Sequence, residues 1–180
     1  FSVAMVTDVG GVDDKSFNES AWNGVKAWGK SHDLKKGANG YDYFASKTNA
    51  DFATNFQQGV SAKYSMLIGV GYATNDALVA SAKQNPKTDY VLVDDVASKQ
   101  YKNIASLTFK QQEASYLAGV AAATKAKELG DSKVGFIGGM NSAVIQSFEA
   151  GYIAGVKSVD PNMKVDAQFA ESFTDTAKAK

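Results

Sequence analysis

Residues 1–20 read FSVAMVTDVGGVDDKSFNES, an apolar run followed at once by a loop rich in glycine and acids. The run FSVAMV has the length and composition of a buried β-strand, and the two glycines allow a sharp turn after it. Ser16 and Glu19 form the S-x-x-E pattern of a capping box, which predicts a helix with Phe17 and Asn18 as its first residues. The stretch therefore predicts a strand, a polar loop and a helix in succession.

The same succession repeats along the whole chain. Strands are expected over residues 2–6, 41–45, 66–71, 90–93, 104–109, 134–138 and 165–170. Helices are expected from Phe17 through Trp28 and over residues 50–63, 75–84, 111–128 and 143–159. Strands and helices in alternation are typical of an α/β fold, with parallel sheets and helices on both faces.

One internal boundary is predicted near Phe109 and Lys110. The strand NIASLTF runs there into KQQEASYLAGVAAATKAK, a long helix rich in small residues that suits the start of a second lobe. Residues 1–109 are thus expected to form a first α/β lobe, and residues 110–180 an incomplete second lobe.

Composition excludes several partners and chemistries. Nineteen basic residues balance 19 acidic ones, so the chain has no excess of positive charge to favour nucleic acid. The chain contains no cysteine, which excludes disulfides, thiolate metal sites and cysteine nucleophiles. No apolar run reaches the length of a membrane-spanning helix. A chain that opens at Phe1 inside a strand is expected to be trimmed, or to have lost an export signal.

Ligands of parallel sheets bind beyond the carboxyl ends of the strands, where loops and helix N-termini converge. The segments expected at that edge are residues 8–18, 71–76, 94–95, 139–142 and 172–175. They are rich in acids, amides, glycines and aromatics, and poor in cations. Because carboxylates accept hydrogen bonds and repel phosphates, this composition favours a neutral ligand rich in hydroxyl and amide donors.

Three more specific motifs are each excluded or disfavoured by particular residues. The segment GGVDDKS has Asp14 where a P-loop needs glycine before its Lys-Ser pair. The segment GFIGGM has Ile137 where a dinucleotide-binding loop needs glycine. Asp13 with Asp14, and Asp94 with Asp95, are sequence neighbours that point opposite ways in an extended chain, which disfavours a carboxylate-pair hydrolase.

The single histidine and most aromatic residues are expected to be structural. His32 lies in the charged segment GKSHDLKK, which favours a surface position over a general base or a zinc ligand. Helical spacing predicts core positions for Trp22, Trp28, Phe52, Phe56 and Phe148. Phe17 and Phe173 instead adjoin polar segments at strand-to-helix junctions, where each is a candidate for facing a ligand.

Several segments resemble the basic membrane protein family of substrate-binding lipoproteins for ABC transporters, the group that contains the purine nucleoside receptor. They are MVTDVGGVDDKSFNESAWNG, GVGYATNDAL, VLVDD, KVGFIGGM with FEAGYIAGVKSVDP, and ESFTDTAKAK. The resemblance implies a bilobed periplasmic-binding-protein fold of type I in three α/β/α layers. It also implies export, a lipid tether on an N-terminal cysteine at the outer side of the cell membrane, a nucleoside ligand and a permease partner. Neither enzyme activity nor a cofactor is implied.

Three polar residues take ligand-binding roles by this resemblance. Asp8 and Asn18 would hydrogen-bond the ligand, and Asp94 would bind a nitrogen edge of the base. For Asp13 and Asp14 the favoured interpretation is structural, because acids near the start of a helix complement its dipole.

Three aromatic residues complete the implied site. Phe17 and Phe173 would stack on the two faces of the base, and Tyr72 would join them. Two other functions stay open. One is a sugar or autoinducer binder of the same fold, whose ligand lacks a flat base for two aromatic rings to enclose. The other is a nucleoside hydrolase-like enzyme, for which the sequence offers no nucleophile elbow, metal cluster or active-site histidine.

The length predicts a fragment. Two complete α/β lobes need about 300 residues, whereas this chain of 180 residues contains only two strands of the second lobe and no lipidation cysteine. A half-built lobe exposes a strand edge and helix faces, which predicts self-association through residues 110–180.

Overall fold

The computed structural model describes residues 1–173, 175, 177 and 178. The chain divides into two compact units, Phe1–Thr108 and Phe109–Lys180. Each unit has its own sheet and its own hydrophobic core. Among the described residues, no helix combines the length and the apolar character needed to cross a membrane.

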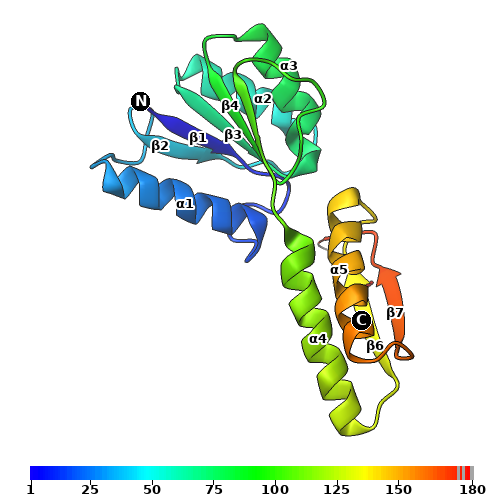
Figure 1. Ribbon diagram of the computed structural model, residues 1–180. Coiled ribbons are helices and arrows are strands. Elements are labelled where there is room, and N and C mark those ends of the chain that lie inside the picture. The colour runs from blue at the N-terminus through cyan, green and yellow to red at the C-terminus, as the bar shows by residue number, and fades with distance from the viewer. Residues whose placement is uncertain (174, 176, 179–180) are drawn as a thin grey trace. The chain divides into compact units, whose positions relative to one another are not determined.

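A five-stranded parallel sheet forms the first unit (Figure 1). Its strands are β1 (Val3–Val6), β2 (Tyr41–Phe44), β3 (Met66–Val70), β4 (Asp89–Val93) and β5 (Ile104–Leu107). They lie in the order β2-β1-β3-β4-β5, and every neighbouring pair is parallel. The chain passes from β1 outward to β2 and then returns to the other side of β1, so the strand order reverses between β1 and β3.

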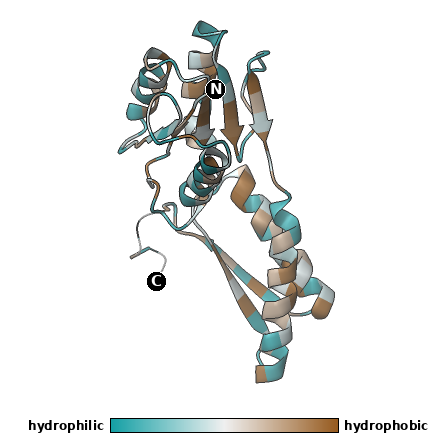
Figure 2. Cartoon of the chain, turned by 90° about the vertical axis from the view of Figure 1, so that its left-hand side faces the viewer, coloured by the Kyte–Doolittle hydropathy of each residue, from teal (hydrophilic) through white to brown (hydrophobic). Residues whose placement is uncertain are grey.

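Helices cover both faces of this sheet. On one face, the odd-numbered residues of β1 pack with Trp22 and Val25 of α1 (Phe17–Ser31). On the other, the even-numbered residues pack with Phe56 of α2 (Asp51–Ser61) and Leu78 of α3 (Asn75–Gln84). All four residues of β1 are buried, which explains why the opening of the chain is apolar without alternation. The hydrophobic colouring of the strands in Figure 2 follows from this burial.

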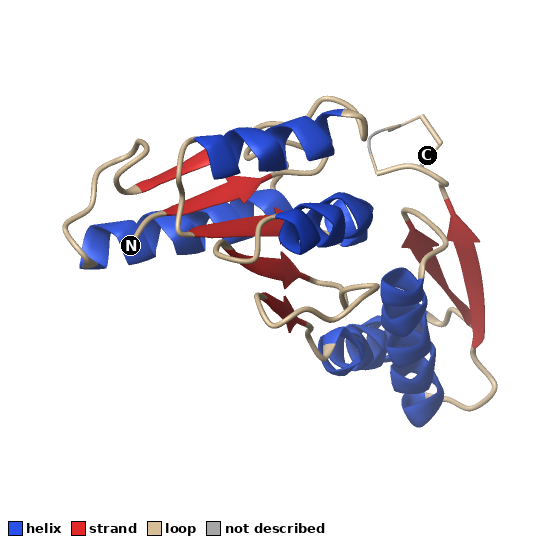
Figure 3. Cartoon of the chain, turned by 90° about the horizontal axis from the view of Figure 1, so that it is seen from above, coloured by secondary structure: helices blue, strands red, loops and turns tan. Residues whose placement is uncertain are grey.

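The second unit pairs β6 (Lys133–Gly138) with β7 (Lys164–Phe169) in parallel, and its helices lie on one face of that pair (Figure 3). Val134 and Val165 face α4 (Gln111–Leu129) and α5 (Ala143–Val159), in a core that contains Val156 and Met163. Alternate residues of both strands are exposed, including Ile137, which is 65% exposed.

Helices α4 and α5 run parallel with their backbones in contact. A Cβ on Gly151 would collide with the carbonyl of Gln112, and a Cβ on Gly155 with the carbonyl of Tyr116. The contact advances in the same direction along both helices, so their N-termini lie at the same end of the pair. This end is the one at which β6 and β7 finish, because each helix is antiparallel to the strand beside it in an α/β unit.

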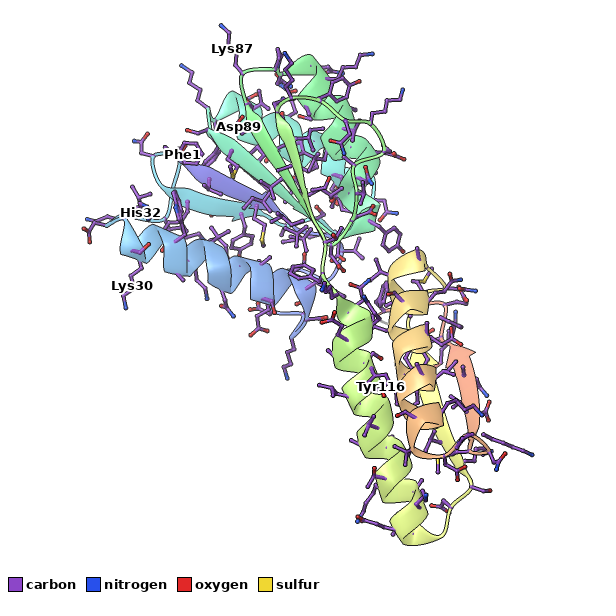
Figure 4. The ribbon with its side chains drawn as sticks, viewed as in Figure 1. Phe1, Lys30, His32, Lys87, Asp89 and Tyr116 are labelled. Atoms are coloured by element: carbon purple, nitrogen blue, oxygen red, sulfur yellow. The ribbon has the colours of Figure 1, made fainter. Side chains whose placement is uncertain are left out.

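The expected strands and helices are all present, with shifts at their ends. The short 3₁₀ helix η1 (Tyr72–Thr74) was not predicted. Trp22, Phe52 and Phe56 are buried as predicted, whereas Trp28 and Phe148 are only partly buried. His32 is exposed at the end of α1, as predicted, and Figure 4 shows it at the surface.

Candidate functional site

The candidate site of the first unit lies at the carboxyl ends of three adjacent strands. Asp8 follows β1, Tyr72 follows β3 and Asp94 follows β4. The segments that carry them are linked: the Gly71 N–H donates to the Val93 carbonyl at 2.9 Å, and Asp8 Oδ2 lies 3.7 Å from the place a Cβ on Gly71 would occupy. The structure therefore brings these three predicted residues to the edge where the strand order reverses, the usual ligand position in such sheets.

Asn18 links two carboxylates behind this edge. Its Nδ2 donates to Asp8 Oδ1 at 2.7 Å and to Asp14 Oδ2 at 2.8 Å, and its Oδ1 accepts the Asp8 N–H at 3.1 Å. The residue is 0% exposed. Both amide hydrogens are thus engaged inside the protein, so Asn18 offers no free donor to a ligand in this arrangement.

The two carboxylate oxygens of Asp8 have different surroundings. Oδ1 accepts hydrogen bonds from Asn18 and from the Gly10 N–H, each at 2.7 Å. Oδ2 has no hydrogen bond from any described residue, and it is the oxygen that lies beside Gly71. An ionised carboxylate accepts at both oxygens, so Asp8 keeps one acceptor for a ligand.

Asp14, rather than Ser16, caps α1. The Ser16 side chain makes no capping hydrogen bond, so the predicted capping box is wrong. The Asp14 carboxylate instead accepts the N–H groups of Ser16, Asn18 and Glu19 at 2.9, 3.1 and 3.0 Å. Burial opposes ionisation of Asp14, but the hydrogen bonds from Glu19, Asn18 and Ser16 together lower its pKa. The structural interpretation of Asp14 is therefore confirmed.

Asp94 is a largely buried acidic residue at the end of β4. It is 8% exposed, and no described residue donates a hydrogen bond to its side chain. Burial raises the pKa of Asp94, and the charge of neighbouring Asp95 raises it further. Its backbone has a left-handed φ of 66°, and its N–H donates to the Leu107 carbonyl at 2.7 Å. The burial that opposes ionisation of Asp94 and its left-handed backbone both cost stability, a pattern typical of functional sites.

Asn75, the first residue of α3, fastens the loop that follows Asp94. Its Nδ2 donates to Asp95 Oδ2 at 2.6 Å and to the Val96 carbonyl at 2.8 Å, and its Oδ1 accepts the Ser98 N–H at 2.9 Å. The sequence placed Asn75 in a ligand-facing segment without revealing this role. The only signal was an amide at the start of a helix, next to a pair of acids on the adjacent strand.

Phe17 and Tyr72 are exposed aromatic residues at the starts of the helices that follow β1 and β3. Phe17, at the start of α1, is 38% exposed, and Tyr72, at the start of η1, is 44% exposed. Gly71 precedes Tyr72 with a φ of 80°, a conformation that lets the chain turn off β3. Exposed aromatic rings beside buried acceptors are characteristic of sites for small ligands.

Phe173 belongs to the second unit. It follows β7, it is 54% exposed, and its ring lies against Gly139, the residue after β6. Within that unit it therefore lies at the carboxyl end of the strand pair, as predicted from the sequence. Residue 174 of the predicted segment 172–175 lies outside the described residues.

The described part of the chain holds no group of three or more His, Asp or Glu side chains placed to bind a metal ion. Asp95, a member of one acid pair weighed as catalytic, accepts hydrogen bonds from Asn75 and from the Val96 N–H at 2.8 Å. Its carboxylate is thus committed to the loop.

The fold is that of the periplasmic-binding-protein-like components of ABC transport systems. A solute-binding protein of an ABC transporter from Aeropyrum pernix K1 superposes with a TM-score of 0.83 at 25% identity, over 94% of this chain and 47% of that chain. The arabinose-binding protein AraP from Geobacillus stearothermophilus has a TM-score of 0.65 at 21% identity, over 92% of this chain and 55% of its own, and shares the fold.

The Bmp family model, described as "ABC transporter substrate-binding protein PnrA-like", matches residues 1–180. The chain belongs to this family, and the resemblance found in its motifs is confirmed.

Two relatives illustrate the range of the family. The "ABC transporter nucleoside-binding protein BmpA" of Lactococcus lactis is 51% identical over 177 residues, which cover 98% of this chain and 49% of the relative. "Basic membrane protein A" of Borreliella burgdorferi is 32% identical, over 96% of this chain and 49% of the relative. The chain spans about half the length of the curated relatives it matches.

Proposed function

We propose that this chain is part of the substrate-binding component of an ABC importer and that its ligand is a nucleoside, with a purine base favoured. The observation that carries the ligand class is the buried Asp94 carboxylate, which has no donor among the described residues and lies at one sheet edge with Asp8. Exposed aromatic rings border that edge. The name of the Lactococcus lactis relative supports the same ligand class.

Each polar residue has a distinct role in this proposal. Asp94 accepts an N–H from the nitrogen edge of the base, because a ligand donor satisfies its unpaired charge. Asp8 accepts a ligand donor through Oδ2. Asn18 is reassigned from direct ligand contact to holding Asp8, since both of its amide hydrogens are engaged.

The aromatic residues bind the base through their faces. Phe17 and Phe173 stack on the base, and Tyr72 borders the ligand. Stacking of a base on an aromatic side chain contributes about 1 to 3 kcal/mol, which is enough to favour ligands with a flat ring system.

The whole protein is proposed to act outside the cytoplasm. It would be anchored by lipid on an N-terminal cysteine, at the extracellular or periplasmic face of the cell membrane, and would deliver its ligand to a permease. Membership of an ABC substrate-binding family supports this part of the proposal. Metabolic labelling of the full-length protein with an alkyne-bearing fatty acid tests the anchor, and loss of label on replacing that cysteine is the expected result.

Calorimetric titration of a full-length protein containing this chain tests the ligand class. Inosine, adenosine and guanosine are expected to bind, cytidine more weakly, and free ribose not measurably. Tight binding of a pyranose with none of the nucleosides would instead favour a sugar-binding protein of the same fold. Incubation with inosine, followed by chromatography for hypoxanthine, separates a binder from a nucleoside hydrolase.

Self-association of this chain through residues 110–180 is a further part of the proposal. Leu117 is 68% exposed on α4, and Ile137 is 65% exposed on β6. Light scattering at micromolar concentration is expected to give a mass above that of one chain, and a strict monomer would contradict it.

A further inference from the structure

The turn after β7 folds back over the end of β6. The two strands are in register to Gly138 and Phe169, and the ladder continues when the Ala170 N–H donates to the Gly138 carbonyl at 2.8 Å. Glu171 has a left-handed φ of 52°, and the Ser172 N–H donates to the Gly139 carbonyl at 3.2 Å. These contacts hold the segment that carries Phe173 above Gly139.

Gly139 provides space for the ring of Phe173. A Cβ built on Gly139 would overlap Cδ1 and Cε1 of Phe173, and the three atoms nearest to that Cβ all belong to Phe173. The φ of Gly139 lies outside the left-handed region, so its backbone conformation is open to alanine. The glycine is therefore required for close approach of the ring and not for its dihedral angles.

The ring of Phe173 is supported by the protein and is also accessible to a ligand. It rests against bare backbone at Gly139, yet 54% of the residue is exposed. A ring stacked on a ligand needs such an arrangement, in which the protein fixes its position and leaves area for the base.

We infer that Gly139 is a positioning residue for nucleoside binding, because its missing side chain sets how far the ring of Phe173 stands from the end of β6. This inference rests on the proposed stacking role of Phe173. A methyl group at residue 139 displaces the ring outward, so the base meets it at the wrong distance. Gly139 thus acts on the ligand only through Phe173.

Gly135, four residues earlier and inside β6, offers a matched control. A Cβ on Gly135 would have the Asp166 carbonyl oxygen as its nearest neighbour at 3.8 Å, an ordinary van der Waals contact. Gly135→Ala therefore adds the same methyl group to β6 without meeting a ring.

A double-mutant cycle with inosine, measured by calorimetry in a full-length protein containing this chain, tests the inference. Gly139→Ala and Phe173→Ala are each expected to weaken binding about tenfold, the lower range of one lost stacking contact. The double variant is expected to bind like Phe173→Ala alone, and Gly135→Ala like the parent. Parental affinity in Gly139→Ala, or a full additional loss in the double variant, would overturn the inference.

Two other outcomes separate the inference from the function on which it rests. If Phe173→Ala binds inosine as tightly as the parent, the stacking role of Phe173 fails and the inference fails with it. If Gly139→Ala does not fold, circular dichroism of the double variant decides. Recovery of the fold when the ring is removed supports the collision with Phe173, whereas a double variant that also stays unfolded shows that backbone at residue 139 is the obstacle and overturns the inference.

Discussion

The Nδ2 of Asn18 lies 2.7 Å from Asp8 Oδ1, so a buried neutral amide fixes one oxygen of a carboxylate whose other oxygen has no donor among the described residues. The same Nδ2 lies 2.8 Å from Asp14 Oδ2. Two negative charges are thereby held close together by one uncharged side chain. The chemistry of residue 18 must therefore be that of a donor, and a carboxylate of the same shape would not serve.

Asn18→Asp is expected to destabilise the protein at pH 7 by about 3 kcal/mol, because it places a buried carboxylate against two partly buried ones. The penalty should be smaller at pH 4, because protonation of the introduced carboxyl group is favoured in acid and relieves the repulsion. Urea unfolding at the two pH values measures both effects. Asn23→Asp, at an exposed position of α1, is the control and should be close to neutral. Equal losses at the two pH values would contradict the electrostatic explanation.

Asp14→Ala is expected to cost about 1 to 2 kcal/mol, since it removes the acceptor of three N–H groups at the start of α1. The lowered pKa of Asp14 means that its contribution is present above the pKa of the unfolded chain, and is lost as pH falls through the folded pKa. Thermal melts from neutral to acidic pH follow this loss.

Ser16→Ala provides the comparison for Asp14, because the Ser16 side chain makes no capping hydrogen bond. We expect its free energy of unfolding to lie within about 0.5 kcal/mol of the parent value. If Ser16→Ala loses as much stability as Asp14→Ala, the Ser16 side chain caps α1 after all, and the assignment of the cap to Asp14 is contradicted.

Asp94→Asn is expected to stabilise the ligand-free protein at neutral pH by roughly 1 kcal/mol, because it removes a charge that burial and neighbouring Asp95 disfavour. Since the pKa of Asp94 is raised in the folded state, the ionised residue costs stability as pH rises from the unfolded towards the folded pKa. The gain from asparagine should therefore disappear in acid, below the unfolded pKa. Melting curves of both proteins across this range test the sign.

The same substitution should weaken nucleoside binding. The asparagine side chain is neutral and carries a donor NH₂ group as well as an acceptor oxygen. It therefore loses the hydrogen bond from the base to a charged acceptor, which is worth about 1.5 to 3 kcal/mol. For the parent, affinity should fall as pH drops through the raised pKa of Asp94. A variant that is both more stable and a weaker binder marks a functional carboxylate, whereas unchanged affinity for inosine would remove Asp94 from the site.

Phe17→Ala is expected to weaken binding of inosine about ten- to a hundredfold, as the loss of one stacking contact implies. Its stability should change little, since Phe17 is 38% exposed. Val9→Ala, which is 46% exposed in the same loop, is the control for a general loss of apolar surface. A large drop in melting temperature with parental affinity would identify Phe17 as a core residue.

The sequence was sufficient to predict the strands and α-helices, though not η1, and the edge of the first sheet at which Asp8, Tyr72 and Asp94 lie. A fully buried β1 and alternating strands and helices leave few arrangements, and the carboxyl ends of parallel strands must lie together. Hydrogen-bond partners were not predictable in the same way. Asp14 and Ser16 are both good caps by residue type, and only the backbone path decides which carboxylate or hydroxyl reaches the free N–H groups.

The role of Asn18 was hidden for a related reason. An asparagine beside a phenylalanine at a strand-to-helix junction suits either a ligand or a buried acid, and the choice depends on where Asp8 and Asp14 point. Similarly, the three hydrogen bonds of Asn75 join residues that are 20 to 23 positions apart, a separation at which sequence patterns carry no information about contact.

The hydrogen bonds that shape the loop after β1 join residues 8, 10, 14, 16, 18 and 19 to one another. A protein engineer who transplants residues 7–19 to the end of an equivalent strand in another parallel sheet would carry the acid, the aromatic ring and their supports together. Exchange of such a cassette between relatives would then alter ligand preference in one step, without the need to redesign the sheet beneath it.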